Sequence, residues 1–193
     1  MSPFDPLQGE LEALARPFAM VGRLRAAGVP ARAIAALTGS WDAGVAFVAV
    51  HRGLRGDTWE PEGPDPRLLL AVREQGVLTD IVALASHDED SWALRSGEGW
   101  CLGYDAWLAA EKGGARTLRV VSTPMDWLRA GADFSASVCV LDWQVGVRML
   151  RGLGEGVTLR CDRGAGDRLR AMLHHGGIPR VAETGGLPTR RAA

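Results

Sequence analysis

The strongest constraint on the fold of this chain is a regular alternation of short apolar runs and helical patterns that begins after Gly103. Strands separated by helices need crossover connections, which are right-handed and place the strands parallel in one sheet. The rhythm therefore predicts an α/β region with a mostly parallel sheet flanked by helices. The predicted strands are 118–122, 137–141 and 157–161, and the predicted helices are 104–112, one opening at Pro124, 144–151 and 165–173.

Ligands of such sheets bind beyond the carboxyl ends of the strands. Those ends are residues 122–126, 142–143 and 162–166. We therefore expect any site of this region to draw on Ser122, Asp126, Asp142 and Asp162.

The segment before Gly103 has the pattern of an antiparallel sheet. Apolar runs at 46–50, 68–72 and 80–85 predict strands, the last two joined as a hairpin around 74–76, and 92–95 fits a third strand of this unit. The sixteen residues 51–66 are dense in Gly and Pro and predict a loop.

The first part of the chain predicts a small helical segment. Apolar residues recur at spacings of three and four, which indicates a helix over about 5–25 that Pro17 kinks or splits. A turn at Gly28 leads to a short helix at 31–37. The predicted units are a helical segment 1–45, an antiparallel module 46–103, the α/β domain 104–182 and a flexible tail 183–193.

The net charge of −1 gives no overall positive field that would attract nucleic acid or an acidic membrane. The charge is nevertheless uneven, with balances of −2 for residues 1–66, −4 for 67–115 and +5 for 116–193. Of the 22 basic residues 21 are Arg, whose planar guanidinium suits phosphate. GC-rich codon usage explains the same excess, since Ala and Gly are also plentiful.

Three cysteines (Cys101, Cys139 and Cys161) stand far apart in or beside apolar runs. They predict reduced core residues of a cytoplasmic protein, because disulfide frameworks and zinc sites need tighter clustering. The start has no basic and apolar leader pattern, and no apolar run approaches the roughly 20 residues of a membrane span. We therefore expect a cytoplasmic protein without a membrane partner.

Residues 119–131 resemble the first motif of Toprim domains, the metal-binding modules of bacterial and phage primases, topoisomerases and related nucleases. In primases this motif is a strand, then Glu-Gly-Pro-x-Asp, then a helix and a Gly. Pro124, Asp126 and Gly131 match it, whereas Ser122 replaces the Glu and Thr123 the Gly.

Residues 161–169 resemble the second motif of the family, a strand ending in Asp-x-Asp before Ala-Gly. Asp162, Ala165 and Gly166 match it, and Gly164 replaces the second Asp. The resemblance covers roughly 68–180 and points to the phage- and plasmid-type DNA primases.

The resemblance implies a site where carboxylates hold Mg²⁺ during phosphoryl transfer and where the Glu acts as acid or base. Ser122 cannot take that role, so Asp126 and Asp162 are left as degenerate catalytic residues that hold Mg²⁺ weakly. Asp126 is equally well explained as a helix N-terminal carboxylate, and for Asp142 we favour a capping role.

Six arginines on or beside the second motif are candidates for a phosphate-facing patch, with a solvated helix face as the alternative. They are Arg148, Arg151, Arg160, Arg163, Arg168 and Arg170. Trp59 and Trp143 are candidates for base stacking, whereas Trp107 and Trp127 fall on apolar helix faces and are expected in the core. No His is placed with Ser or Cys as a hydrolase triad requires.

The leading hypothesis is a primase-like Toprim protein of a phage, prophage or other mobile element, catalytically degenerate, that binds nucleic acid or assists DNA replication. Single-stranded or primed DNA and a replicative helicase or other replication protein are the expected partners. Retained activity would be Mg²⁺-dependent nucleotidyl transfer or nuclease cleavage. The alternatives are a helix-turn-helix regulator that binds DNA through 22–39, with Arg23, Arg25 and Arg32 near phosphates, and a structural or interaction protein.

Overall fold

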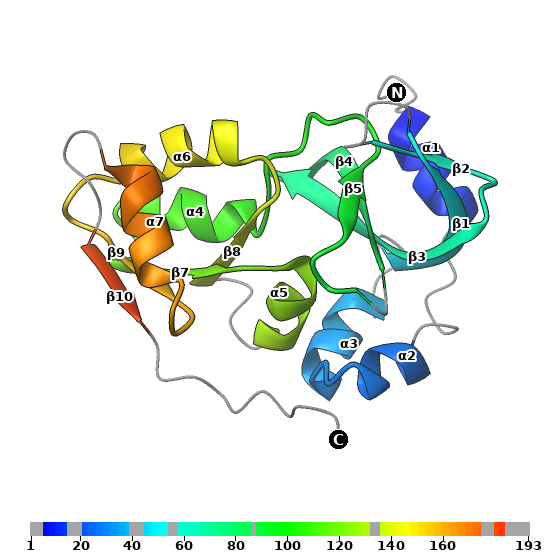
Figure 1. Cartoon of the computed structure of the whole chain (residues 1–193), viewed down its shortest axis with the longest axis horizontal. Coiled ribbons are helices and arrows are strands. Elements are labelled where there is room, and N and C mark those ends of the chain that lie inside the picture. The colour runs from blue at the N-terminus through cyan, green and yellow to red at the C-terminus, as the bar shows by residue number, and fades with distance from the viewer. Residues whose placement is uncertain are drawn as a thin grey trace.

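The computed structural model describes residues 6–14, 21–38, 45–53, 58–85, 88–131, 136–174 and 180–183. Within these ranges the chain forms two five-stranded sheets, one antiparallel and one mostly parallel, with helices around them (Figure 1). The predicted mixed α/β class is confirmed. No helix in these ranges is long and apolar enough to cross a membrane.

The first sheet is antiparallel and has the order β2-β1-β3-β4-β5. Its strands are β1 (Val45–Arg52), β2 (Trp59–Pro61), β3 (Asp65–Glu74), β4 (Val77–Ala85) and β5 (Trp92–Leu94). The predicted hairpin is its centre, because β3 and β4 pair from Arg67 opposite Ala85 to Glu74 opposite Val77. Gln75 and Gly76 form the turn with φ values of 51° and 83°, both positive as a type I′ turn requires.

The predicted loop at 51–66 is wrong in part. Strand β1 continues to Arg52, β2 pairs with it, and β3 already begins at Asp65. Strand β2 lies at the edge of the sheet, where Pro61 is tolerated because an edge strand has a side without ladder hydrogen bonds. The segment 51–66, rich in Gly and Pro, therefore contains a short strand and is not one continuous loop.

The prediction that Trp59 stacks on bases is also wrong. Its side chain is fully buried, with 0% exposure, and its Nε1 donates a hydrogen bond to the carbonyl oxygen of Ile81 at 2.9 Å. The indole packs in a core cluster with Leu11 of α1 (Pro6–Leu14) and with Leu69. No face of this ring is left for a ligand.

The second sheet has the order β10-β9-β7-β8-β6. Strands β7 to β10 are parallel, and β6 runs antiparallel to β8. The strands are β6 (Cys101–Leu102), β7 (Thr117–Val121), β8 (Ser137–Val140), β9 (Thr158–Cys161) and β10 (Arg180–Glu183). The three predicted strands of this sheet are confirmed.

Strands β6 and β10 were not predicted. Two residues show no periodicity, yet β6 pairs with β8 and so moves 101–102 from the predicted antiparallel module into the second sheet. Glu183 belongs to β10 and not to a tail, and the rest of the predicted tail lies outside the described residues.

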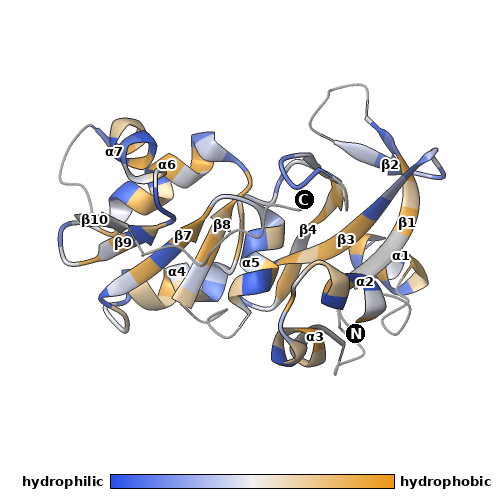
Figure 2. Ribbon diagram, turned by 60° about the horizontal axis from the view of Figure 1, so that its bottom comes forward, coloured by the Kyte–Doolittle hydropathy of each residue, from blue (hydrophilic) through white to orange (hydrophobic). Residues whose placement is uncertain are grey.

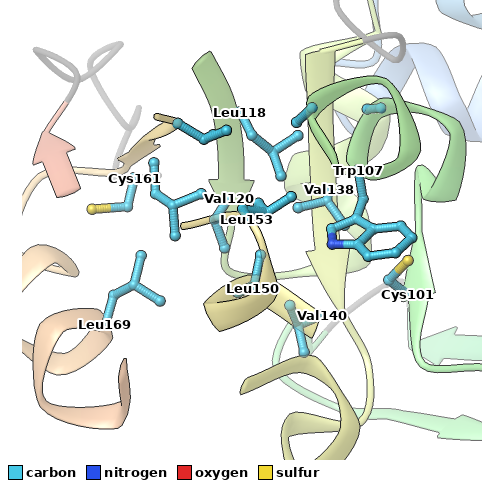
Figure 3. Packing of buried hydrophobic residues seen from close by; sticks show 14 of the residues in the cluster. Cys101, Trp107, Leu118, Val120, Val138, Val140, Leu150, Leu153, Cys161 and Leu169 are labelled. Carbon is cyan, nitrogen blue, oxygen red and sulfur yellow. The ribbon is translucent and has the colours of Figure 1, made fainter. Parts of the chain in front are cut away.

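Helices cover both faces of the parallel sheet. They are α4 (Tyr104–Glu111), α5 (Pro124–Ala130), α6 (Trp143–Gly152) and α7 (Gly166–Leu173), close to the predicted ranges. Alternate strand residues such as Leu118, Val120 and Val138 point to α4, α6 and α7, where Trp107, Leu150 and Leu169 meet them (Figure 3). Val121 and Cys139 point to the other face, toward α5.

The opposite placement of α5 and α6 follows from the strand order. The chain steps from β7 to β8 in one direction along the sheet and from β8 back past β7 to β9 in the other. Because both crossovers are right-handed, their helices must lie on opposite faces.

A third core cluster joins the two sheets. Helices α2 (Val21–Ala26) and α3 (Ala31–Thr38) meet at a turn where Gly28 has a φ of 81°, and they contribute Leu24 and Ile34 to this cluster. Residues from strands β3 to β8 and from α5 complete it, and Figure 2 shows apolar residues along the strands of both sheets. The helix predicted over 5–25 is confirmed at 6–14 and 21–26, and Pro17 lies outside the described residues.

Two further predictions about single residues hold. Cys101, Cys139 and Cys161 are buried and free of disulfides. Burial raises the pKa of Cys101 and of Cys139, so both thiols stay protonated in the core. Trp107 is buried, and Trp127 packs against the cluster between the sheets while its Nε1 donates to the Ser137 carbonyl oxygen at 3.2 Å.

Candidate functional site

The parallel sheet has a topological switch point between β7 and β9. These strands are neighbours, and the connections that follow them leave in opposite directions. The carboxyl ends of both strands border a cavity of about 370 Å³. Sheets of this kind bind their ligands in the crevice at such a point.

Three parts of the chain line this crevice. The carboxyl ends of the strands contribute Ser122 and Cys161, and the starts of α6 and α7 contribute Trp143, Gly164 and Arg168. The third part is the antiparallel sheet with the turn before β5, which adds Asp90 and Trp92.

The lining combines groups that suit a phosphate and an aromatic ring. Ser122 and Arg168 are exposed, and Trp143 is half-buried at the first position of α6. Helix α7 follows Gly164, which has a φ of 85°, and its N-cap Ala165 makes no side-chain capping hydrogen bond. Guanidinium, hydroxyl and helix N-terminus all favour a phosphate, and an indole offers a stacking surface.

Asp162, directly after β9, is paired with an arginine of the neighbouring strand. Arg119 of β7 donates from Nη2 to the Asp162 carboxylate at 3.2 Å. The sequence analysis did not predict a role for Arg119. The signal that could have indicated one is a charged residue between Leu118 and Val120, in a strand expected to be apolar on both faces.

Asp126 lies in the first turn of α5 and is tied to its own helix. Its backbone N–H donates to Thr123 Oγ1 at 3.0 Å, and that hydroxyl donates back to the Asp126 carboxylate at 2.9 Å. Arg129 Nη1 lies 3.3 Å from the same carboxylate. The helix N-terminal role weighed for Asp126 is confirmed.

Asp142 caps α6, as favoured from the sequence. Its Oδ1 accepts from the backbone N–H groups of Gln144 at 2.7 Å and Val145 at 3.3 Å. These bonds satisfy donors that the first turn of a helix leaves open.

The carboxylates do not match the requirements of a magnesium site. Mg²⁺ needs convergent, free carboxylate oxygens, whereas Asp126 and Asp162 are each paired with an arginine and Asp142 caps a helix. Among the residues that the structure describes, no three His, Cys, Asp or Glu side chains are grouped so that they could hold a metal ion. Weakly held Mg²⁺ at Asp126 and Asp162 stays a prediction.

The six predicted arginines do not share one surface. Arg151 is half-buried and donates to the Met172 carbonyl oxygen at 2.9 Å, which ties α6 to α7. Arg170 pairs with Asp167 at 2.7 Å. Arg148, Arg160, Arg163 and Arg168 are exposed, but only Arg168 lines the crevice.

The helical pair predicted as an alternative DNA-binding unit is packed on α5. Arg129 Nε donates to the Ala27 carbonyl oxygen at 2.9 Å, and a Cβ on Gly131 would come within 2.2 Å of the Ala33 Cβ. Arg23, Arg25 and Arg32 are exposed. The apolar side of α2 and α3 thus belongs to the common core.

Comparison of the chain with protein-family models, with curated proteins and with solved structures gives no match. Any function assigned to the chain therefore depends on the geometry and chemistry of its own residues.

Proposed function

We propose that this protein is a Toprim-like, primase-type protein of a mobile element that has lost catalysis and binds single-stranded nucleic acid as an accessory of DNA replication. The observation that carries the proposal is the crevice at the switch point, which combines Ser122, Trp143 and Arg168. Arg168 and the Ser122 hydroxyl bind a backbone phosphate, and a base stacks on Trp143.

The Toprim part of the proposal is supported by where the two partial motifs lie. Residues 122–126 follow β7 and residues 162–166 follow β9, and these strands are paired neighbours. Two motifs separated by about forty residues of sequence thus meet at one edge of the sheet, as the resemblance requires.

Loss of catalysis is supported by the partners of the two carboxylates. A guanidinium beside each of Asp126 and Asp162 supplies the positive charge that a metal ion would otherwise bring. Ser122 offers a hydroxyl where the family has a carboxylate, and that hydroxyl donates to phosphate without repelling it.

Two substitutions in the crevice test whether it binds single-stranded DNA. Arg168→Glu should weaken binding of a fluorescent oligo(dT) strand by about tenfold at 0.1 M salt, because it loses one phosphate contact and adds a repulsive charge. Trp143→Ala should weaken it by about five- to tenfold through lost stacking. Fluorescence anisotropy over a salt series measures both.

The matched control is Arg116→Glu, which makes the same charge change on an exposed residue at the amino end of β7, away from the crevice. It should bind within about twofold of the parent protein. Absence of salt-sensitive binding by the parent protein would contradict the proposal. Mg²⁺-dependent primer synthesis or cleavage that disappears in Asp162→Ala would restore the catalytic alternative, and preferential duplex binding lost in Arg32→Glu would favour the helix-turn-helix one.

A further inference from the structure

The face of the parallel sheet opposite α6 and α7 carries two arginines side by side. Residues opposite each other in paired parallel strands point to the same face, and Arg119 of β7 stands opposite Arg160 of β9. Their neighbours Leu118 and Leu159 point into the cluster under α6 and α7. Both arginines therefore lie on the other face.

The described residues cover this face only in part. Figure 1 shows α5 on the side of the sheet away from α6 and α7, where it contacts β7 and β8. Parallel sheets usually have helices over both faces and apolar residues throughout. On β9, however, Arg160 is exposed and Thr158 on the same face is half-buried.

The positive charge on this face is incompletely balanced. Neighbouring strands are about 4.8 Å apart, and like charges directly opposite each other destabilise a sheet. Asp162 offsets Arg119 at 3.2 Å. In contrast to Arg119, the Arg160 guanidinium makes no hydrogen bond and no ion pair within the described part of the chain. Arg163 is exposed in the turn that follows, at the carboxyl edge of the sheet.

The occupant that complements this face is an anion. The ten residues after β10, 184–193, carry two arginines and no acidic residue, so this segment has the same sign of charge as the face. Repeated phosphates of a nucleic-acid strand have the opposite sign, and the hydroxyl and guanidinium on β9 are both donors for phosphate oxygens.

We infer that the β9 face carrying Thr158 and Arg160 binds backbone phosphates of the same single strand that occupies the crevice, so that the strand passes from the crevice over Arg163 onto the sheet. This inference rests on the proposed function. It gives the site a second phosphate contact on the face away from α6 and α7.

The test uses the full chain and a fluorescent twenty-nucleotide oligo(dT). Arg160→Gln should weaken binding about fivefold at 0.1 M salt and lower the slope of log K against log salt by about 0.7, as expected for one phosphate contact. Arg160→Glu should weaken it further. The control Arg52→Glu reverses an exposed arginine of the antiparallel sheet and should change binding by less than twofold.

The outcomes separate this inference from the proposed function. If the parent protein binds and Arg168→Glu weakens binding while Arg160→Glu does not, the sheet-face site is overturned and the crevice stands. If the parent protein does not bind, both fail. If Arg160→Glu and Arg52→Glu weakened binding of the oligo(dT) strand equally, the loss would reflect nonspecific charge attraction, and the proposed site would be overturned. If Arg160→Glu changed only the self-association of the protein, measured by sedimentation, the proposed site would be overturned in favour of a contact between copies of the chain.

Discussion

Asp80 shows how a single carboxylate can be buried with no cationic partner among the described residues. It is 0% exposed on β4, and its oxygens accept five backbone hydrogen bonds, from Ile81, Arg95, Ser96, Glu98 and Gly99, at 2.7 to 3.0 Å. These donors fix the segment that leads from the antiparallel sheet to the parallel one. Buried charge is tolerated here because it is fully hydrogen-bonded.

Asp80→Asn should therefore destabilise the protein although it preserves the shape of the side chain. The amide nitrogen would face the N–H groups of Glu98 and Gly99, which now share one carboxylate oxygen. Leaving the buried Gly99 donor and the partly buried Glu98 donor without this acceptor costs about 2–4 kcal/mol. Urea unfolding followed by tryptophan fluorescence measures the loss, and Asp105→Asn, on an exposed residue of α4, should change stability by less than about 0.5 kcal/mol. Equal stabilities of the two variants would contradict this role.

At the scale of elements, α5 is joined to two other parts of the chain through Arg129. The guanidinium contacts Glu89, in the turn before β5, at 2.5 and 2.6 Å, and its Nε binds the turn between α2 and α3 at Ala27. The hydrogen bond from Arg129 lowers the pKa of Glu89 below its ordinary value of 4.5, although desolvation opposes the shift. Arg129 thus holds the turn near Asp90 and Trp92 against the helix that follows β7.

The lowered pKa of Glu89 makes this link dependent on pH. Its contribution to stability is present above the ordinary pKa of 4.5 and is lost as the pH falls through the lower pKa of the folded state. Glu89→Gln should lower stability at pH 7 by at most about 1 kcal/mol, since the pair is partly exposed and screened by water.

The difference between Glu89→Gln and the parent protein should shrink as the pH falls below 4.5 and disappear when Glu89 is protonated in both states. Urea titrations at several pH values test this. The exposed Glu155→Gln variant is the reference for a carboxylate without such a partner in the described structure. A difference that grows toward low pH would contradict the assigned sign.

At the scale of the whole molecule, helices α2 and α3 and both sheets share one core cluster. The cluster between the sheets takes residues from α2, α3, β3, β4, β5, β6, β7, α5 and β8. The predicted units 1–45, 46–103 and 104–182 therefore bury their apolar faces against one another. We expect them to unfold together, because none would keep its core covered alone.

Thermal unfolding should accordingly show one transition, with far-ultraviolet circular dichroism and tryptophan fluorescence giving the same midpoint. Tryptophans on both sheets report on it, since Trp59 belongs to the first and Trp107 packs on the second. Two separate transitions would show that the sheets fold as independent domains.

Local pattern determined most of the elements. Short apolar runs predicted β3, β4, β7, β8 and β9, and the longer stretches between the last three predicted helices, because strands buried on both faces, such as β8, are nearly continuous apolar segments. The pattern failed for β6, which has two residues, and for β2, where Gly and Pro resemble a loop. Short edge strands owe their conformation to the partner strand, which lies elsewhere in the chain.

The candidate site, like the fold, could be predicted from the sequence only in part. The sequence by itself placed Ser122, Asp126, Asp142 and Asp162 at strand ends, since those positions depend only on where strands stop. Four features depend on how the elements pack: Arg119 pairs with Asp162, Trp92 and Trp143 line the same crevice, Trp59 is buried, and Arg160 lies on the sheet face opposite α6 and α7. The physical reason is that charge pairing, stacking and exposure depend on contacts between residues distant in sequence, which no local period records.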